Sequence, residues 1–439
     1  VAALALAWVA VLLPVLGAGV SVRSPNATAA AITDYFLPRF AAPKLTPTQF
    51  LFVSSPTEHK VVYTELKNFK SATGRTFALI DSGLLEPAGI AFDPSRGFLY
   101  VADRGASRIY RYRVLVQEGS SSGRQAYTLA TDGVQLCVMQ GAAVEFVSVD
   151  ISGDVFYSDQ TRNTVNRIPA DTIDRLAEGA YQCGDLRIKS EKVQMQEARA
   201  SASELESMAD AEREELQPTD APNTEPVVFS IYESSLNPHV TAPGGVASDG
   251  ARLYWTNKAA GAEAGVLVQG QVQPELPPSM ARANATAVPF PSRPLASGIS
   301  GAYGVATSTT MVFYSANHSG SGFVYGLVPG GQPHAFASSL ISPRGLCWDG
   351  DNTLYVADER GNSVFSLPVG RLMDDAPLTQ SAALTGAFGV ALFTLPAGAA
   401  AAEFFARSSA GPRLAGGPLP AALQWLLPLL AARALAAAG

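Results

Sequence analysis

Few side chains of this chain combine the residue types and spacings that catalysis or metal binding requires. The histidines show no short metal-binding spacing such as H-E-x-x-H; they are His59, His239, His318 and His334. The segment GSSSG around Ser121 matches the G-x-S-x-G pattern of a serine nucleophile, which needs a strand–turn–helix context. Here it lies in a glycine- and serine-rich run that predicts a flexible loop. The sequence contains no phosphate-binding or dinucleotide-binding fingerprint.

The cysteines indicate structure rather than chemistry. Cys137 and Cys183 flank a strand-rich segment, and we expect them to form a disulfide in an oxidising compartment. Cys347 lies in the strand-like GLCWD and is interpreted as a buried apolar thiol. Three cysteines without a close pair do not make a zinc framework.

The elements that would position any site come from an internal repeat. Around Gly89 the chain reads EPAGIAFDPSRGFLYVADRGASRIYRYRV, and around Gly345 it reads SPRGLCWDGDNTLYVADERGNSVFSLPVG. Each copy has short apolar strands bounded by Gly, Asp, Asn or Ser turns. Weaker copies begin at Ser148, Gly245 and Gly304, and the shortest spacing gives a unit of about 40 residues.

The two ends of the repeat region favour a closed ring over a solenoid. FGVALFTL near the C-terminus supplies only a first strand, and FLFVSSPTEHKVVYTEL near the N-terminus supplies later strands. Together they complete a sixth unit, and radial repetition leaves only protected sheet edges. We therefore predict an all-β, six-bladed β-propeller over residues 48–398, with a closing blade shared by both ends.

The unit resembles a known group of propellers. The pattern P-x-G-I-A-x-D followed by L-Y-V-A-D is similar to the six-bladed propellers that include NHL repeats and the gluconolactonase-like proteins. LYWTN at 253–257 also resembles the YWTD blades of lipoprotein-receptor ectodomains. The resemblance covers roughly residues 48–395, and it implies a fold far more specifically than a function.

The resemblance implies where a metal site would be. Gluconolactonase-like proteins carry Asn or Asp ligands just before the glycine of the first strand of a blade, and a hard cation needs several such oxygens. In this sequence those positions hold Ala88, Val147, Gly244, Tyr303, Arg344 and Phe388. None supplies a carboxylate or amide, and Glu145 is the one acid nearby. A metal-dependent lactonase is therefore the alternative, and no metal or cofactor is predicted.

A second set of recurring polar residues ends the middle strand of each unit: Asp103, Asp159, Asn257, Asn317 and Asp358. Asp and Asn at strand ends bond backbone N–H groups of turns. Their regular recurrence predicts turn capping rather than a ring of ligands.

What remains is a candidate binding surface. The aromatic and cationic residues Tyr303, Arg344 and Phe388, with Arg104 in a neighbouring loop, are expected to gather on one face. Tyr and Arg are enriched among binding hot spots. The competing interpretation is that these side chains only fill the funnel of the ring.

An acidic insertion interrupts the third unit. We place it at 184–228, and its part from Lys189 to Pro218 is rich in Glu and poor in β-branched residues. This composition favours a helix or a charged disordered arm over another strand.

Both termini are apolar. Residues 1–21 are interpreted as a secretory signal peptide, followed by a linker at 22–47. The tail at 399–439 has small residues, a spacer and an apolar run, which matches a GPI-attachment signal, although Arg433 interrupts it. A short membrane anchor, or a disordered or packed tail, stays open for this segment.

Composition and sequons fit the secretory pathway. The three N-x-[ST] sequons at Asn26, Asn284 and Asn317 are candidate glycosylation sites. Hydrophobic residues make up 47% of the chain and its net charge is −7, which argues against disorder and against nucleic-acid binding. We predict an extracellular or cell-surface binding or scaffold module for a protein or glycan ligand, and favour this over an enzyme. A rigid spacer is the third alternative.

Overall fold

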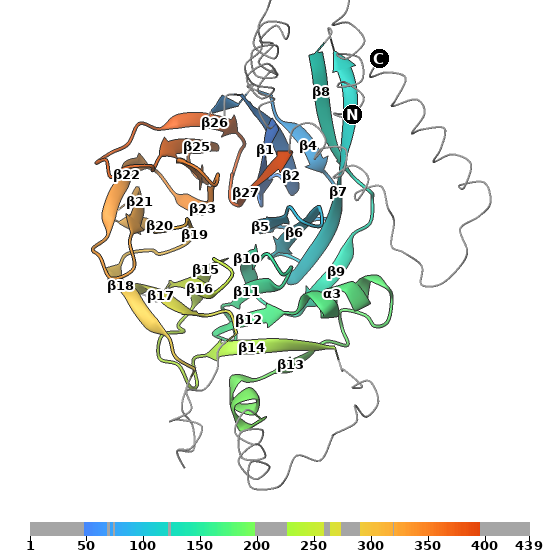
Figure 1. Ribbon diagram of the computed structural model, residues 1–439, viewed down its shortest axis with the longest axis vertical. Coiled ribbons are helices and arrows are strands. Elements are labelled where there is room, and N and C mark those ends of the chain that lie inside the picture. The colour runs from blue at the N-terminus through green and yellow to red at the C-terminus, as the bar shows by residue number, and fades with distance from the viewer. Residues whose placement is uncertain are drawn as a thin grey trace, which may run out of the picture. The chain divides into compact units, whose positions relative to one another are not determined.

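The computed structural model describes residues 48–395, except 68–70, 73–74, 122–123, 198–225, 259–263, 274–289 and 319. In this part of the chain six β-sheets surround a central axis (Figure 1). The inner strands of neighbouring sheets contact one another all the way round. The fold is therefore a six-bladed β-propeller, as the repeat predicted.

Blade 1 closes the ring. It consists of β27 (Val390–Leu395), β1 (Thr48–Ser55), β2 (Lys60–Lys67), β3 (Ser71–Ala72) and β4 (Phe77–Ile80). β27, from the C-terminal end of the ring, pairs antiparallel with β1 from Val53↔Val390 to Thr48↔Leu395. The shared closing blade predicted from the two half-units is confirmed.

The remaining blades follow in chain order. Blade 2 contains β5 (Pro87–Asp93), β6 (Phe98–Asp103), β7 (Arg108–Ser121), β8 (Arg124–Thr131) and β9 (Leu136–Gln140). Blade 3 contains β10 (Val144–Val149), β11 (Val155–Asp159), β12 (Thr164–Ile168), β13 (Arg187–Lys189) and β14 (Val227–Glu233). The helix α3 (Ala170–Ala177) lies between β12 and β13.

Blades 4 to 6 each have four strands. Blade 4 contains β15 (Pro243–Ser248), β16 (Arg252–Asn257), β17 (Gly265–Gln271) and β18 (Arg293–Ile299). Blade 5 contains β19 (Val305–Thr307), β20 (Val312–His318), β21 (Ser321–Leu327) and β22 (His334–Leu340). Blade 6 contains β23 (Pro343–Trp348), β24 (Thr353–Asp358), β25 (Ser363–Pro368) and β26 (Thr379–Ala383).

The strands are almost continuously apolar because both faces of each blade are buried. All six residues of β24 are buried, and so are five of the six in β6. Aromatic rings fill the junction between blades 1 and 2, where Phe393 packs against Phe52 and Phe92 at centroid distances of 6.5 and 4.9 Å. Packing between blades therefore takes the place of a single central core.

Glycines let the inner strands approach closely. A Cβ on Gly304 would lie 2.0 Å from the carbonyl oxygen of Arg344, and one on Gly245 would lie 2.3 Å from that of Tyr303. These oxygens belong to the backbone of the next blade and cannot move aside. Only glycine fits at these two positions, which explains the first residue of the repeat.

Hydroxyl groups link consecutive blades beside these glycines. Ser315 Oγ donates to the carbonyl oxygen of Arg344 in the next blade at 2.8 Å, and Ser158 Oγ donates to that of Gly244 at 2.5 Å. Ser54 and Thr256 make the equivalent bonds to Ala88 and Tyr303. The backbone at the start of four of the six inner strands is thereby fixed.

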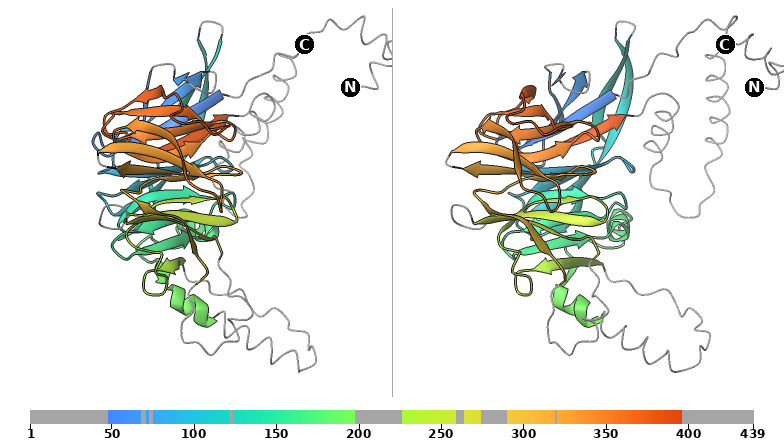
Figure 2. Two further views of the ribbon diagram at one scale, coloured as in Figure 1. Left: turned by 90° about the vertical axis from the view of Figure 1, so that its left-hand side faces the viewer. Right: turned by 60° about the vertical axis from the view of Figure 1, so that its left-hand side comes forward.

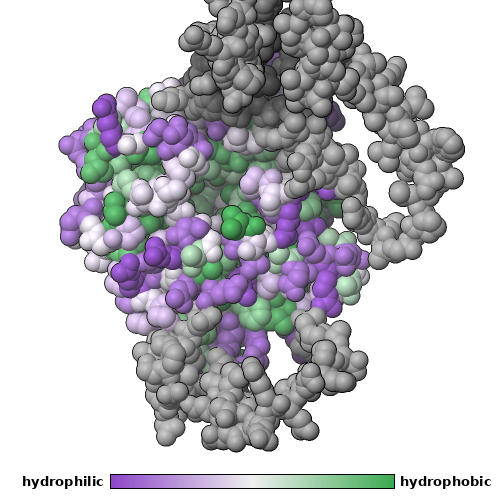
Figure 3. Space-filling view, viewed as in Figure 1, coloured by the Kyte–Doolittle hydropathy of each residue, from purple (hydrophilic) through white to green (hydrophobic). Residues whose placement is uncertain are grey.

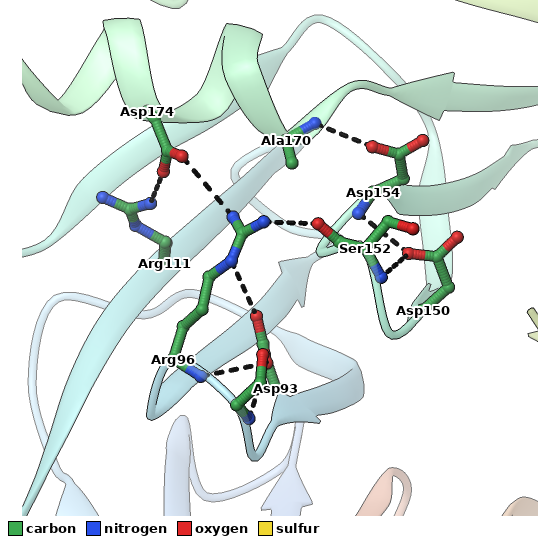
Figure 4. A network of polar contacts seen from close by, with 9 residues as sticks. Asp93, Arg96, Arg111, Asp150, Ser152, Asp154, Ala170 and Asp174 are labelled. Atoms are coloured by element: carbon green, nitrogen blue, oxygen red, sulfur yellow. Dashed lines mark hydrogen bonds and ion pairs between the residues drawn. The ribbon is translucent and has the colours of Figure 1, made fainter. Parts of the chain in front are cut away.

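A polar network joins blades 2 and 3 and anchors α3 (Figure 4). Asp174 of α3 contacts Arg96 and Arg111 of blade 2 at 3.6 and 3.5 Å. Asp154 Oδ1 accepts the Ala170 N–H at the start of the helix at 2.8 Å. The helix α3, whose buried face includes Ile173, was not predicted from the sequence.

The hairpin of β7 and β8 corrects the interpretation of GSSSG. Its strands continue past the ring as a two-stranded ribbon (Figures 1 and 2), and Ser121 pairs with Arg124 near the tip. The predicted loop is thus partly strand; residues 122–123 lie outside the described residues. No helix follows, so the nucleophile context is absent here.

The insertion is partly built into blade 3. β13 pairs parallel with β14, and residues 191–197 are helical. Residues 198–225 lie outside the described part, as do the predicted signal peptide, the linker up to residue 47 and the tail. Among the described helices, none is long and apolar enough to cross a membrane.

The predicted disulfide is present: Cys137 and Cys183 are bonded, with their Cα atoms 5.8 Å apart.

Candidate functional site: the mouth of the central channel

In four blades a β-bulge lies at the start of the inner strand. It determines which residues face the axis. In blade 2 the register shifts between Pro87 and Ile90, and in blade 3 it shifts between Val144 and Val147. Val147 therefore matches Ile90, and Glu145 matches Ala88. The assignment of Val147 to this position was wrong, because Phe146 replaces the glycine on which the repeat alignment depended.

The inner strands enclose a channel cavity of about 300 Å³ directly beyond these residues. Its walls are the inner strands, whose side chains there include the apolar Ile90, Val246 and Leu346 and the polar Ser148, Ser248 and Thr307, but no charged residue. In the space-filling view hydrophobic residues lie around the middle of the ring and hydrophilic residues toward its edge (Figure 3). The channel itself offers little chemistry, so the site is sought at its end.

We call the residues at this end the mouth cluster, and they come from all six blades. They are Arg104, Glu145, Lys258, Tyr303, Arg344, Glu359 and Phe388. Some lie at or just before the start of an inner strand, and others directly follow the middle strand of their blade. Both kinds of position lie at one end of the propeller, which brings together residues far apart in sequence.

Glu145 is the central acid of the mouth cluster. Its side chain is buried and contacts the Lys258 ammonium, and it accepts a hydrogen bond from the Gln160 side chain. A guanidinium nitrogen of Arg104 lies 3.6 Å from the other carboxylate oxygen. One carboxylate is thus shared by two cations and an amide.

Arg344 is the central cation. Its Nε and one terminal nitrogen both lie 2.7 Å from Glu359 Oε2. Its guanidinium carbon lies 3.8 Å from the Tyr303 ring centroid and 5.8 Å from that of Phe388, in the range of cation–π contacts. The other terminal nitrogen, NH1, is buried and has no hydrogen-bond partner among the described residues. An unpaired buried donor of this kind is costly and marks a place where an acceptor would bind well.

The four residues predicted as a binding surface do lie together. Arg104 is 6.0 Å from the ring centroid of Phe388, and Arg344 contacts both aromatic rings. Their exposure differs, however: Arg104 is exposed and Tyr303 is half-buried, whereas only 1% of Phe388 is exposed. Phe388 therefore lies beneath the other side chains, and a ligand role for all four stays a prediction.

The electrostatics of the mouth cluster are uneven. Burial, and next the guanidinium groups of Arg344 and Arg104, lower the pKa of the Lys258 ammonium to about 7, and the Glu359 carboxylate opposes this shift. Arg104 and Lys258 flank Glu145, while Glu86 pairs with Arg104 and Glu359 pairs with Arg344.

The same arrangement fits a divalent cation poorly. Glu145 is the only carboxylate among the residues before the inner strands, and its neighbours are positive. In the described part of the chain no group of three His, Cys, Asp or Glu side chains is placed to hold a metal. The backbone carbonyl oxygen of His239 accepts a hydrogen bond from the Trp255 ring nitrogen, and His334 lies on β22 near Asp374. The family-type metal site does not carry over.

The recurring acids cap turns. Asp103 accepts the backbone N–H groups of Leu85, Glu86 and Ala106, at 2.8 to 3.1 Å. Asp358 accepts those of Ile341 and Ser342 at 2.8 and 2.7 Å. The predicted structural role of these two acids is confirmed.

Blade 5 departs from the alignment that placed Asn317 among these acids. Tyr314 pairs with Val305 as Val101 pairs with Ile90, so Ala316 occupies the capping position. Asn317 comes one residue later and is half-buried. Its glycosylation stays a prediction. Asn26 and Asn284 lie outside the described residues.

The ion pair between Glu145 and Lys258 was not predicted from the sequence. A recoverable signal exists for Lys258, which follows Asn257 as Arg104 follows Asp103 and Glu359 follows Asp358. Charged residues directly after the capped strand end thus recur at the mouth.

Solved structures of other proteins resemble this chain in fold alone. No family model and no curated protein matches the chain. A structure of the nidogen/laminin complex is similar at 14% identity and TM-score 0.46, covering 79% of this chain and 98% of that one. A PQQ-bound aldose sugar dehydrogenase from Streptomyces coelicolor is similar at 15% identity and TM-score 0.42, covering 76% and 90%. The gluconolactonase XC5397 from Xanthomonas campestris is similar at 14% identity and TM-score 0.35, covering 67% and 77%.

Proposed function

We propose that this protein is a secreted or cell-surface binding module whose mouth cluster recognises an acidic group of an extracellular protein or glycan. The observation that supports this most directly is the buried, unpartnered NH1 of Arg344. It belongs to a guanidinium already held in place by Glu359 and Tyr303. Its neighbours would have to move aside for a ligand carboxylate to reach this buried nitrogen, and the carboxylate would then satisfy it while Glu359 and Tyr303 keep the guanidinium in place.

Binding is tested with the full-length protein on an array of carboxylated and neutral glycans and of acidic and neutral peptides. We expect retention of at least one carboxylated probe, reduced at least tenfold by Arg344→Met. Arg371→Met serves as the control, because Arg371 is an exposed arginine on blade 6 outside the mouth cluster. Equal binding by the wild type and Arg344→Met, or retention of no acidic probe, contradicts the proposal.

The placement in the secretory pathway has its own experiment. Expression of the chain with a start methionine in eukaryotic cells should yield cleavage near residue 21 and a mobility shift on removal of N-linked glycans. Release from the cell surface by a phosphoinositide-specific phospholipase identifies a GPI anchor. Retention of the intact chain in the cytosol without glycans contradicts this part of the proposal.

The competing function is a metal-dependent lactonase. The charges around Glu145 argue against it, because Lys258 and Arg104 would repel a divalent ion at the one available carboxylate. Measuring the bound divalent metal and the thermal stability with and without a chelator separates the two functions. A stoichiometric ion whose removal lowers Tm, together with lactone hydrolysis, would favour the enzyme.

A further inference from the structure

A second cavity lies on blade 4, at the opposite end of its strands from the mouth cluster. It measures about 290 Å³ and is lined by Arg252 at the start of β16, by residues 269–271 of β17 and by residues 291–293. Lys258 of the mouth cluster directly follows β16, so the rise along this strand separates Arg252 from Lys258 by about 20 Å.

Two unpaired arginines give this cavity a positive charge. None of its lining residues is acidic, and neither Arg252 nor Arg293 forms an ion pair with the residues that the structure describes. The nearest acid on the same hairpin is Asp249, which accepts hydrogen bonds from the Arg252 backbone N–H at 2.6 Å and the Tyr254 hydroxyl at 3.0 Å. The Tyr254 hydroxyl also bonds to the Arg252 side chain. Neither guanidinium is neutralised by a direct ion pair among the described residues.

A neutral partner holds Arg293 in place. Its Nε donates to Gln269 Oε1 at 2.8 Å, and the Gln269 amide, 6% exposed, donates in turn to the Tyr254 hydroxyl at 3.3 Å. An amide orients the guanidinium as a carboxylate would, but it leaves the positive charge uncompensated. The terminal nitrogens remain as a fork suited to an oxyanion.

Buried polar side chains also fix the rim of the cavity. The Ser292 hydroxyl and the Asn237 amide bond each other at 2.9 and 3.0 Å. Glu191 Oε1 accepts the Phe290 N–H at 2.9 Å. Asn237 and Glu191 are 1% and 0% exposed, so the segment carrying Arg293 is held from below. A preformed rim lowers the ordering cost of binding.

We propose that this cavity is a binding site for a tetrahedral oxyanion, sulfate or phosphate, carried on a sugar-sized group. Two guanidinium groups from different strands can bond oxygens that point in different directions, whereas a planar carboxylate is satisfied by a single fork. The volume is at the lower limit of ligand pockets and suits one sugar residue. Gln271 and Ser292 supply neutral groups for hydroxyls. The inference does not depend on the function proposed for the mouth cluster.

The chain contains a matched comparison. A cavity of about 340 Å³ between blades 5 and 6 is lined by Arg371, but also by Asp351. One cation and one carboxylate cancel, so this cavity of similar size should not hold an anion. Arg371→Gln is therefore the control variant for the blade 4 site.

The experiment measures binding to the full chain by calorimetry at low, constant ionic strength, because salt screens exposed charges. The probes are sodium sulfate, a sulfated monosaccharide and its unsulfated parent. We expect one site per chain for the sulfated sugar, unchanged by Arg371→Gln and weakened at least tenfold by the double variant Arg252→Gln/Arg293→Gln. Both arginines are exposed, so the double variant should keep its unfolding midpoint.

The probes separate the two sources of the oxyanion. Tighter binding of the sulfated sugar than of free sulfate supports the sugar-borne ligand, and equal binding of both assigns the site to the free ion. The conservative pair Arg252→Lys/Arg293→Lys should recover part of the affinity, because charge without the fork remains. Equal affinity for the unsulfated sugar, no saturable binding of either sulfate probe, or undiminished binding by the double Gln variant overturns the proposal.

Discussion

The mouth cluster and the polar network of Figure 4 both pair arginines with carboxylates across neighbouring blades, yet their carboxylates have different partners. In the network, Asp93 accepts the backbone N–H groups of Ser95 and Arg96, and Asp154 accepts that of Ala170, whereas Asp174 contacts arginine side chains alone. At the mouth, within the described residues, Glu145 and Glu359 accept only side-chain donors.

This difference separates structure from a candidate for binding. A carboxylate that accepts backbone N–H groups fixes the path of a loop, and replacing it forces the loop to rearrange. A carboxylate with side-chain donors alone can exchange a donor for a ligand while the loop stays in place. The network is therefore expected to contribute to stability, and the mouth cluster is expected to contribute to binding at a smaller cost in stability.

The largest effect is expected at Asp93, which is 1% exposed. Asp93→Ala leaves the amides of Ser95 and Arg96 without their acceptor and should lower the free energy of unfolding by about 3 kcal/mol. Urea unfolding measures it, and Asp93→Asn should recover part of the loss. A loss below about 1 kcal/mol would remove the distinction between the two regions.

A pH dependence is expected next, from Lys258. Because its pKa is lowered in the folded protein, the unfolded chain binds more protons between about pH 7 and pH 10, and stability rises with pH in that window. Lys258→Met should remove this rise, which amounts to at most about 3 kcal/mol in unfolding free energy between pH 7 and 9.5. Parallel stability curves for the wild type and the variant, measured by urea unfolding at pH 7 and 9.5, would show that Glu145 cancels the shift.

The fold followed from the sequence to the number of blades, because each unit carries its own turn signals. The LYVAD strands ending at Asp103 and Asp358 need only local chemistry to be recognised. The closing blade followed from two incomplete units. α3 did not, because its short apolar face, including Ile173, is stabilised by contacts with blade 2 that the repeat does not encode.

The site followed only in part. Tyr303, Arg344 and Phe388 align by the glycine that follows each of them, whereas Phe146 in that position concealed Glu145. The contact between Glu145 and Lys258 joins blades 3 and 4 and depends on ring geometry. The cavity on blade 4 is likewise formed by residues 269–271 and 291–293, which lie on either side of a long connection. Their spacing in the sequence therefore did not indicate a shared site.

The smallest effect on stability is expected at Arg104. Its side chain is 44% exposed and lies 3.0 Å from Glu86 Oε2, which is also exposed, so Arg104→Met should change the free energy of unfolding by less than about 0.5 kcal/mol. Its effect on binding should be larger, because a charge at the rim steers an acidic ligand and raises the association rate. Surface plasmon resonance at two salt concentrations measures this: the variant should bind a carboxylated probe more slowly at low salt and equally at high salt. An unchanged association rate with a large loss of stability would place Arg104 with the structural network instead, and the division between the two regions would fail at its most exposed residue.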